Sequence, residues 1–185
     1  MSTRRQLVQA LAGLCGAMAL PGARAGTLPP APAGFTWFTS TNGAGTFLRP
    51  DGWFAKEETH GDTQAVFITK TSIADGGNFD IGFTVNAFEH VSRGGKTPSA
   101  AATSLIARLA TRGRVLLTDV VKGNALDMNV VRIVDTARGA AVVIHYLTIG
   151  DDAKDRVWLI FFEAPQAEWD ANYPLGRAML NAFGL

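Results

Sequence analysis

The chain has 185 residues, of which 47% are hydrophobic and 18% are charged, and its formal net charge is +1 at pH 7. This balance excludes an intrinsically disordered chain, and the small net charge excludes a strongly basic nucleic-acid-binding protein. The single cysteine excludes a disulfide framework and any metal centre built from several cysteines.

Residues 1–25 predict a signal peptide. Arg4 and Arg5 give it a positive start, and residues 7–20 form an apolar segment too short to span a bilayer as a helix. Small residues at positions 23 and 25 indicate cleavage between Ala25 and Gly26, with an uncleaved anchor as the alternative. Residues 3–8 resemble a twin-arginine export signal, with an ordinary Sec signal as the alternative. We therefore expect a periplasmic or secreted bacterial protein with no stable membrane span after cleavage.

Cleavage would change the charge and chemistry of the chain. The segment carries three arginines, no acidic residue and the lone Cys15, so the remainder has 14 basic and 16 acidic residues and a net charge of −2. Leu14 is too bulky for a lipoprotein signal at Cys15, so lipidation is not expected. The mature protein must then be stabilised by its core alone, for which about 160 residues suffice.

The rest of the chain predicts one domain that begins with strands. Residues 26–34 contain three prolines and predict an extended lead-in to a single domain at 35–185. Short apolar runs separated by turn signals, such as Asn42-Gly43, predict strands joined by hairpins. The first five strands are expected at residues 35–40, 46–49, 53–59, 64–70 and 80–90.

A helix is predicted from Pro98 to Arg112, because Thr97 is a favourable N-cap, proline is favoured in the first turn and Gly113 follows the last turn. Four further strands are expected at residues 114–121, 126–135, 140–149 and 156–163, joined by connections short enough for antiparallel hairpins.

A closing helix is predicted from Pro165, with Pro174 expected to kink it or split it in two. The last two predicted strands are apolar on both faces, so both sides of the sheet need cover. The pattern predicts an α+β fold with helices on each face of a mostly antiparallel sheet.

Several segments resemble the PsbP-like family, named for an extrinsic subunit of photosystem II. They are residues 47–53 (FLRPDGW), 65–67 (AVF), 83–86 (FTVN), 98–99 (PS) and, above all, 157–183, which contains EAP at 163–165 and LNAF at 180–183. The resemblance covers about residues 35–185 and implies an α/β/α sandwich, a fold that a Ran-binding nuclear transport protein shares. It also implies an accessory or binding role, and it carries over no functional residue.

No catalytic or metal-binding motif stands out. Gly94-Gly95-Lys96-Thr97 resembles the end of a phosphate-binding loop, but His90 stands where that motif needs glycine, so we interpret it as a loop before a helix. A group of acids near a predicted hairpin end, Glu57, Glu58 and Asp62 with His60, is interpreted as a solvated turn rather than a divalent-cation site. No cofactor, metal or catalytic residue is therefore predicted.

The strongest candidate ligand-binding residues are Arg132, His145 and Glu163, which lie in predominantly apolar strands. Tight turns would place Arg132 opposite Val143 and Val143 opposite Phe161. In that register all three side chains share one face, and Glu163 is the expected acidic partner of Arg132. A structural ion pair near the end of the sheet is the simpler interpretation of the same pattern.

Three functions remain open. The leading one is an exported, non-enzymatic accessory or binding protein of the cell envelope that acts on a protein partner. The second is a carrier of a small apolar or amphipathic ligand held between sheet and helix. An enzyme using Arg132, His145 and Glu163 is the third and least favoured.

Overall fold

The computed structural model describes residues 28–77, 79–123, 126–137 and 139–182. The predicted signal peptide, with Arg4, Arg5 and the junction of Ala25 and Gly26, lies outside these residues. The chain divides into two units, residues 1–30 and residues 31–185, and the following description concerns the second. Within the described residues, no helix is long and apolar enough to cross a membrane.

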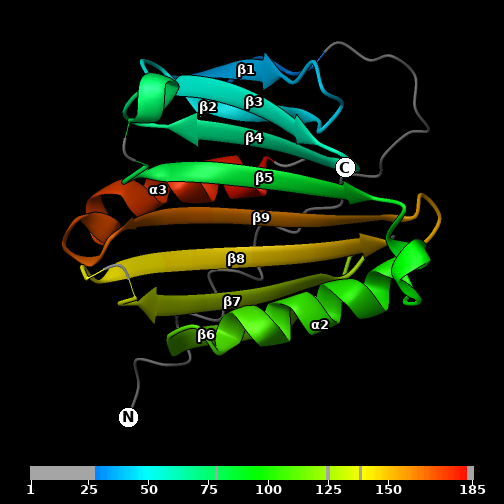
Figure 1. Cartoon of the computed structure of the whole chain (residues 1–185). Helices are drawn as coiled ribbons and strands as arrows, with labels where there is room; N and C mark the ends of the chain where they lie inside the picture. Colours follow the sequence, from blue (N-terminus) through cyan, green and yellow to red (C-terminus); the bar gives the residue numbers. More distant parts are fainter. Residues whose placement is uncertain (1–27, 78, 124–125, 138, 183–185) are drawn as a thin grey trace. The chain divides into compact units, whose positions relative to one another are not determined.

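The described residues of the second unit form two sheets, two α-helices and three 3-10 turns (Figure 1). A two-stranded sheet pairs β1 with β2, and a seven-stranded antiparallel sheet has the order β3-β4-β5-β9-β8-β7-β6. The elements are β1 (Phe35–Thr39), β2 (Thr46–Pro50), β3 (Phe54–His60), β4 (Thr63–Thr69), η1 (Ala74–Gly76), β5 (Gly82–Glu89), η2 (Val91–Gly94), α2 (Pro98–Ala110), β6 (Arg114–Val121), β7 (Met128–Asp135), β8 (Val142–Asp151), β9 (Arg156–Pro165), η3 (Gln166–Glu168) and α3 (Trp169–Asn181).

The nine strands predicted from the sequence are all present, and α2 begins at Pro98 as predicted. The Thr97 side chain accepts a hydrogen bond of 3.3 Å from the Ala100 backbone N–H, which is the expected N-cap. The large antiparallel sheet and the two helices confirm the α+β class.

The closing helix differs from the prediction. Pro165 is the last residue of β9, where it lies opposite Val142, and α3 begins only at Trp169 after a 3-10 turn. Pro165 has an extended backbone, so its ring ends the strand rather than starting the helix. Pro174 lies within α3, which is one helix of 13 residues, so of the two expected outcomes, a kink or a split, the split was wrong.

Alternate residues of the sheet pack against different elements. Ile144 of β8 belongs to an apolar cluster with Leu109 of α2, whereas its neighbour Val143 belongs to a cluster that includes Met179 of α3 and Phe47 of β2. We call the two sides the α2 face and the α3 face. In Figure 1, α2 crosses in front of β7 and β8, and α3 lies behind β5 and β9.

Two glycines allow the helices to approach the sheet closely. A Cβ at Gly150 of β8 would overlap the backbone of Pro98 and Ser99, at the start of α2. A Cβ at Gly176 of α3 would overlap the ring of Phe162 in β9. Both positions therefore need a residue without a side chain.

Candidate functional site

Arg132 of β7 and His145 of β8 lie directly opposite each other on the α3 face. The Arg132 Nε–H donates a hydrogen bond of 3.1 Å to Nδ1 of His145. His145 is only 7% exposed, whereas Arg132 is half-buried, so the acceptor of this hydrogen bond lies in the core and the donor at its border. The imidazole acts as an acceptor at Nδ1, which places the proton of the neutral ring on Nε2.

Two aromatic rings of α3 complete this cluster. The guanidinium carbon of Arg132 lies 4.3 Å from the ring centre of Tyr173 and 5.2 Å from that of Trp169. The two rings stack on each other with centres 4.6 Å apart and planes 20° from parallel, and the His145 ring centre lies 5.8 Å from that of Tyr173. The cluster therefore joins α3 to β7 through a cation–π contact.

The protonation state of His145 follows from this environment. Burial, the larger effect, and the positive charge of Arg132 together lower the pKa of His145 from 6.5 to about 3. A proton on Nδ1 would replace the acceptor of the Arg132 hydrogen bond with a donor and place two cations in contact. His145 is therefore neutral at physiological pH.

Glu163 does not join this cluster, which corrects the sequence prediction. The structure pairs Arg132 with His145 rather than with Val143, because the connection between β7 and β8 is wider than a two-residue turn. It also pairs Val143 with Ala164 rather than with Phe161. That second change is a shift of three residues, and an odd shift reverses the face of every side chain in the strand.

Glu163 consequently lies opposite Ile144, on the α2 face, where it is 3% exposed. Its side chain and that of Arg132 leave opposite faces of the sheet. The predicted ion pair between Arg132 and Glu163 was wrong, and His145 is the hydrogen-bonding partner of Arg132. The part of all three residues in ligand binding stays a prediction.

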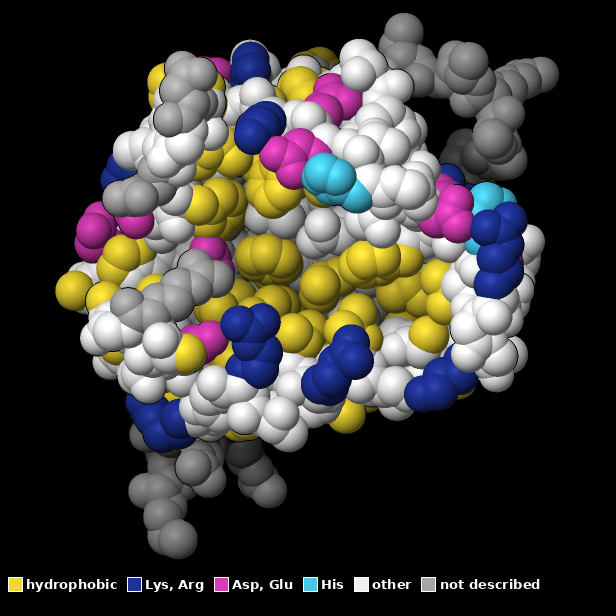
Figure 2. All heavy atoms as spheres, viewed as in Figure 1, with side chains coloured by type: hydrophobic (Ala, Val, Ile, Leu, Met, Phe, Trp, Pro, Cys, Tyr) yellow, Lys and Arg dark blue, Asp and Glu magenta, His cyan; other side chains and the backbone are white. Residues whose placement is uncertain are grey.

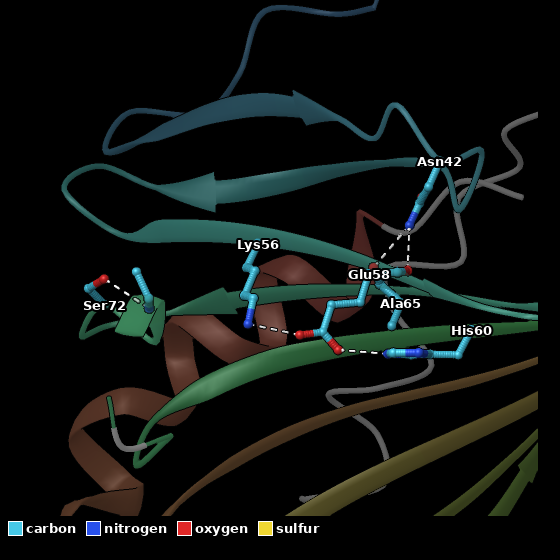
Figure 3. A network of polar contacts seen from close by, with 7 residues as sticks. Asn42, Lys56, Glu58, His60, Ala65 and Ser72 are labelled. Carbon is cyan, nitrogen blue, oxygen red and sulfur yellow. Dashed lines mark hydrogen bonds and ion pairs between the residues drawn. The ribbon is translucent and has the colours of Figure 1, made fainter. Parts of the chain in front are cut away.

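The acidic residues near the β3–β4 hairpin are engaged by other side chains. Glu58 forms an ion pair of 2.8 Å with Lys56 and a contact of 3.2 Å with Nε2 of His60, so the three side chains form one row along β3 (Figure 3). Hydrogen bonds from Lys56 and then His60 lower the pKa of Glu58. The Asn42 side-chain amide donates to the backbone oxygens of Glu58 and Ala65, which ties the β1–β2 loop to this hairpin.

The remaining acidic residues of this group, Glu57 and Asp62, also contact other side chains. Glu57 accepts hydrogen bonds of 2.9 to 3.0 Å from Thr41 and Asn42. Burial acts to raise the pKa of Glu57, but these hydrogen bonds together lower it below its ordinary value. Asp62 contacts Arg93 at 2.9 Å. Across the residues with a defined placement, no group of three or more histidine, cysteine, aspartate or glutamate side chains could hold a metal ion.

A hollow of about 320 Å³ lies on the α2 face, between α2 and the paired ends of β5 and β9. We call it the α2 groove. It is lined by Phe88, Val91, Lys96, Ala101, Ser104, Leu105, Arg108 and Val157. Figure 2 views this side of the molecule: hydrophobic side chains gather across the middle of the sheet, and basic side chains follow the border of α2.

The edge of the α2 groove is positively charged. Lys96 and Arg108 are both exposed, and the Lys96 Nζ donates to Oγ of Ser104 at 3.2 Å. Within the described part of the chain, neither cation forms an ion pair with a carboxylate. The α2 groove thus combines an apolar floor with two available cations, on the opposite face from Arg132 and His145.

The sequence analysis did not identify the α2 groove. It considered Lys96 only as part of a loop before the helix. The detectable signal was the spacing of Ala101, Leu105 and Arg108, which places them on one stripe of the helix at i, i+4 and i+7. The spacing could not show that the facing strands leave this stripe uncovered.

Comparison with known proteins identifies the fold. No protein-family model matches the sequence, and no curated protein matches it. Among solved structures, the chain is similar to the Ran-binding protein Mog1p of Saccharomyces cerevisiae, with a TM-score of 0.51, 17% identity and coverage of 81% of this chain and 94% of that one.

Two further solved structures agree with this assignment. The cyanobacterial PsbP of Synechocystis sp. PCC 6803 matches with a TM-score of 0.51, 13% identity and coverage of 87% of this chain and 98% of that one. A protein of unknown function from Pseudomonas aeruginosa, a putative regulator, matches with a TM-score of 0.51, 11% identity and coverage of 82% and 96%. The chain therefore has a PsbP/Mog1-like fold, and at these identities the likeness concerns the fold alone.

Proposed function

We propose that this protein is an exported, non-enzymatic binding or accessory protein of the cell envelope, built as an α/β/α sandwich, whose binding surface is the α2 groove. The observation that carries the proposal is the apolar floor of the groove beside two exposed cations, neither of which pairs with a carboxylate among the described residues. Such a surface suits an acidic and partly apolar partner. The Ran-binding activity of Mog1p is a precedent for a binding role on this fold.

The Arg132 and His145 cluster supports a non-enzymatic role. The Nδ1 lone pair of His145 is taken up by Arg132, and its ring is buried against Tyr173. A histidine in this state is poorly placed to exchange protons with a substrate. We assign the cluster to the attachment of α3 rather than to chemistry.

Partner binding is tested by in-cell photo-crosslinking from Leu105, inside the α2 groove, followed by mass spectrometry of the adducts. If the α2 groove is the binding surface, a defined envelope protein should be captured, and Arg108→Glu should reduce its capture by about tenfold. Arg177→Glu is the matched control, because Arg177 is exposed on α3. Equal capture by both variants would show that the Arg108 charge does not contribute to partner binding, and no capture from Leu105 would place the partner elsewhere.

The export part of the proposal rests on Arg4, Arg5 and the small residues before Gly26. Mass spectrometry of the protein from its native host should find Gly26 as the first residue. Replacing both arginines by lysine should abolish export on the twin-arginine route, and unchanged export would assign the Sec route. An intact Met1 in the envelope fraction would contradict cleavage.

A second function, carriage of a small anionic amphiphile, is favoured by the size and lining of the α2 groove. A volume of 320 Å³ is at the lower end of the range for small-molecule sites. Calorimetric titration with decanoate should give saturable binding that Arg108→Glu weakens by about tenfold and Arg177→Glu does not change. No heat of binding would exclude this function and leave the protein-partner proposal intact.

A further inference from the structure

The edge strand β6 is unusually apolar for a free edge. Seven of its eight residues are exposed, and it supplies four of the six large hydrophobic side chains that are exposed in the described part of the chain: Val115, Leu116, Leu117 and Val120. One side of β6 pairs with β7, and no strand among the described residues pairs with its other side. A free apolar edge is a template for pairing with another strand.

The opposite edge of the same sheet has a different character. Strand β3 carries Lys56, Glu58 and His60 in a row, joined by the Lys56–Glu58 ion pair and the hydrogen-bonding contact between Glu58 and His60 (Figure 3). Charged side chains are a common protection of free edges against pairing. Strand β6 has only two charged residues, Arg114 and Asp119, so the protection is present at one edge and reduced at the other.

A bulge in β6 places these two charges on the same face. Arg114 lies opposite Val134 and Asp119 opposite Val130, and both valines belong to the α3 face. Residues five apart in a regular strand point to opposite faces, but the register shift between Val115 and Leu117 removes that difference. Neither charge is in an ion pair among the residues that the structure describes.

We propose that β6 pairs antiparallel with β6 of a second copy of this chain, about a two-fold axis perpendicular to the sheet. In the register that places Arg114 opposite Asp119 of the other copy, the symmetry gives two such ion pairs. Val115 then lies opposite Thr118, which shares its face, and Leu116 and Leu117 of both copies meet at the axis. A two-fold interface requires this self-complementarity of one surface.

The sequence of β6 therefore matches a second copy in both charge and apolar content. The interface is one strand wide, so the dimer should be weak and should dissociate on dilution. The pairing would join two sheets of seven strands edge to edge. It leaves the α2 groove free, because β6 contributes no residue to it.

The proposal is tested by sedimentation equilibrium of the full chain over a range of protein concentrations. Wild-type protein should show a reversible monomer–dimer equilibrium. Arg114→Asp places two acids opposite each other, and Asp119→Arg places two arginines opposite each other, so each variant alone should associate at least about tenfold more weakly. Lys56→Asp on β3 is the control and should leave the equilibrium unchanged.

Mixing the two variants gives the decisive result. A copy with acids at both positions complements a copy with arginines at both, so an equal mixture should form heterodimers about as stable as the wild-type dimer. The double variant Arg114→Asp/Asp119→Arg should also dimerise like wild type. A monomeric wild type, or a dimer that these charge changes leave intact, would overturn the proposal.

Discussion

Protonation of His145 should make the stability of this fold fall as the pH falls. The unfolded chain binds a proton at His145 with a pKa near 6.5, whereas burial and Arg132 hold the folded pKa at about 3. Between these values the unfolded state carries the proton and the folded state does not. The stabilising effect is therefore complete above pH 6.5 and is lost progressively as the pH falls toward 3.

The magnitude follows from the separation of the two pKa values. At pH 4 the unfolded group is fully protonated and the folded group is mostly neutral, which lowers the free energy of unfolding by roughly 3 kcal/mol relative to pH 7. This loss of unfolding free energy is a large share of the total stability of a small domain. It should shift the urea midpoint well outside experimental error.

Urea unfolding of wild type and His145→Gln at pH 7 and pH 4 measures this effect. Fluorescence of the buried Trp169, stacked on Tyr173, provides one signal of unfolding. Glutamine can accept the Arg132 hydrogen bond but does not titrate. The variant should be less stable at pH 7 and should lose about 3 kcal/mol less than wild type on acidification. Equal losses in the two proteins would refute the reasoning, since carboxylates such as Glu57 titrate in both.

Three substitutions test the packing of the two helices. Gly176→Ala should destabilise the protein by about 2 kcal/mol despite the higher helix propensity of alanine, because its Cβ meets the ring of Phe162, and Phe162→Leu should reduce that cost in a double-mutant cycle read by urea unfolding. Gly150→Ala should lower the melting temperature, while Gly94→Ala, with open space around it, should not; equal melting temperatures would contradict the close approach of α2. Thr97→Ala should cost about 1 kcal/mol through loss of the N-cap, and an unchanged urea midpoint would show that this cap contributes nothing.

Local sequence patterns predicted the elements of this fold well. The alternation of apolar residues placed the strands, and Thr97 with Pro98 placed the start of α2, because these signals depend only on neighbouring residues. The end of β9 was harder to predict from the sequence. Proline is compatible both with the last residue of a strand and with the first turn of a helix, and the pairing of Pro165 with Val142 decided between them.

Strand register was the main quantity that the sequence left open. Arg132 and His145 share a face under either the predicted or the observed register, since the difference between the two is an even number of residues. Glu163 changed face because the shift between β8 and β9 is odd. The α2 groove is further from prediction still, since it depends on which strands α2 leaves uncovered.

The position of β9 has a consequence for the kinetics of folding. It is the last strand in the chain, yet it lies at the centre of the sheet between β5 and β8. During synthesis, β5 is complete at Glu89, but its partner β9 starts only at Arg156. At about 5–20 residues per second, the ribosome needs roughly 3–13 s to synthesise the intervening residues. During that time the meander of β3, β4 and β5 exposes the edge that β9 will cover, so a nascent chain stalled before Arg156 should be a preferred substrate for holdase chaperones.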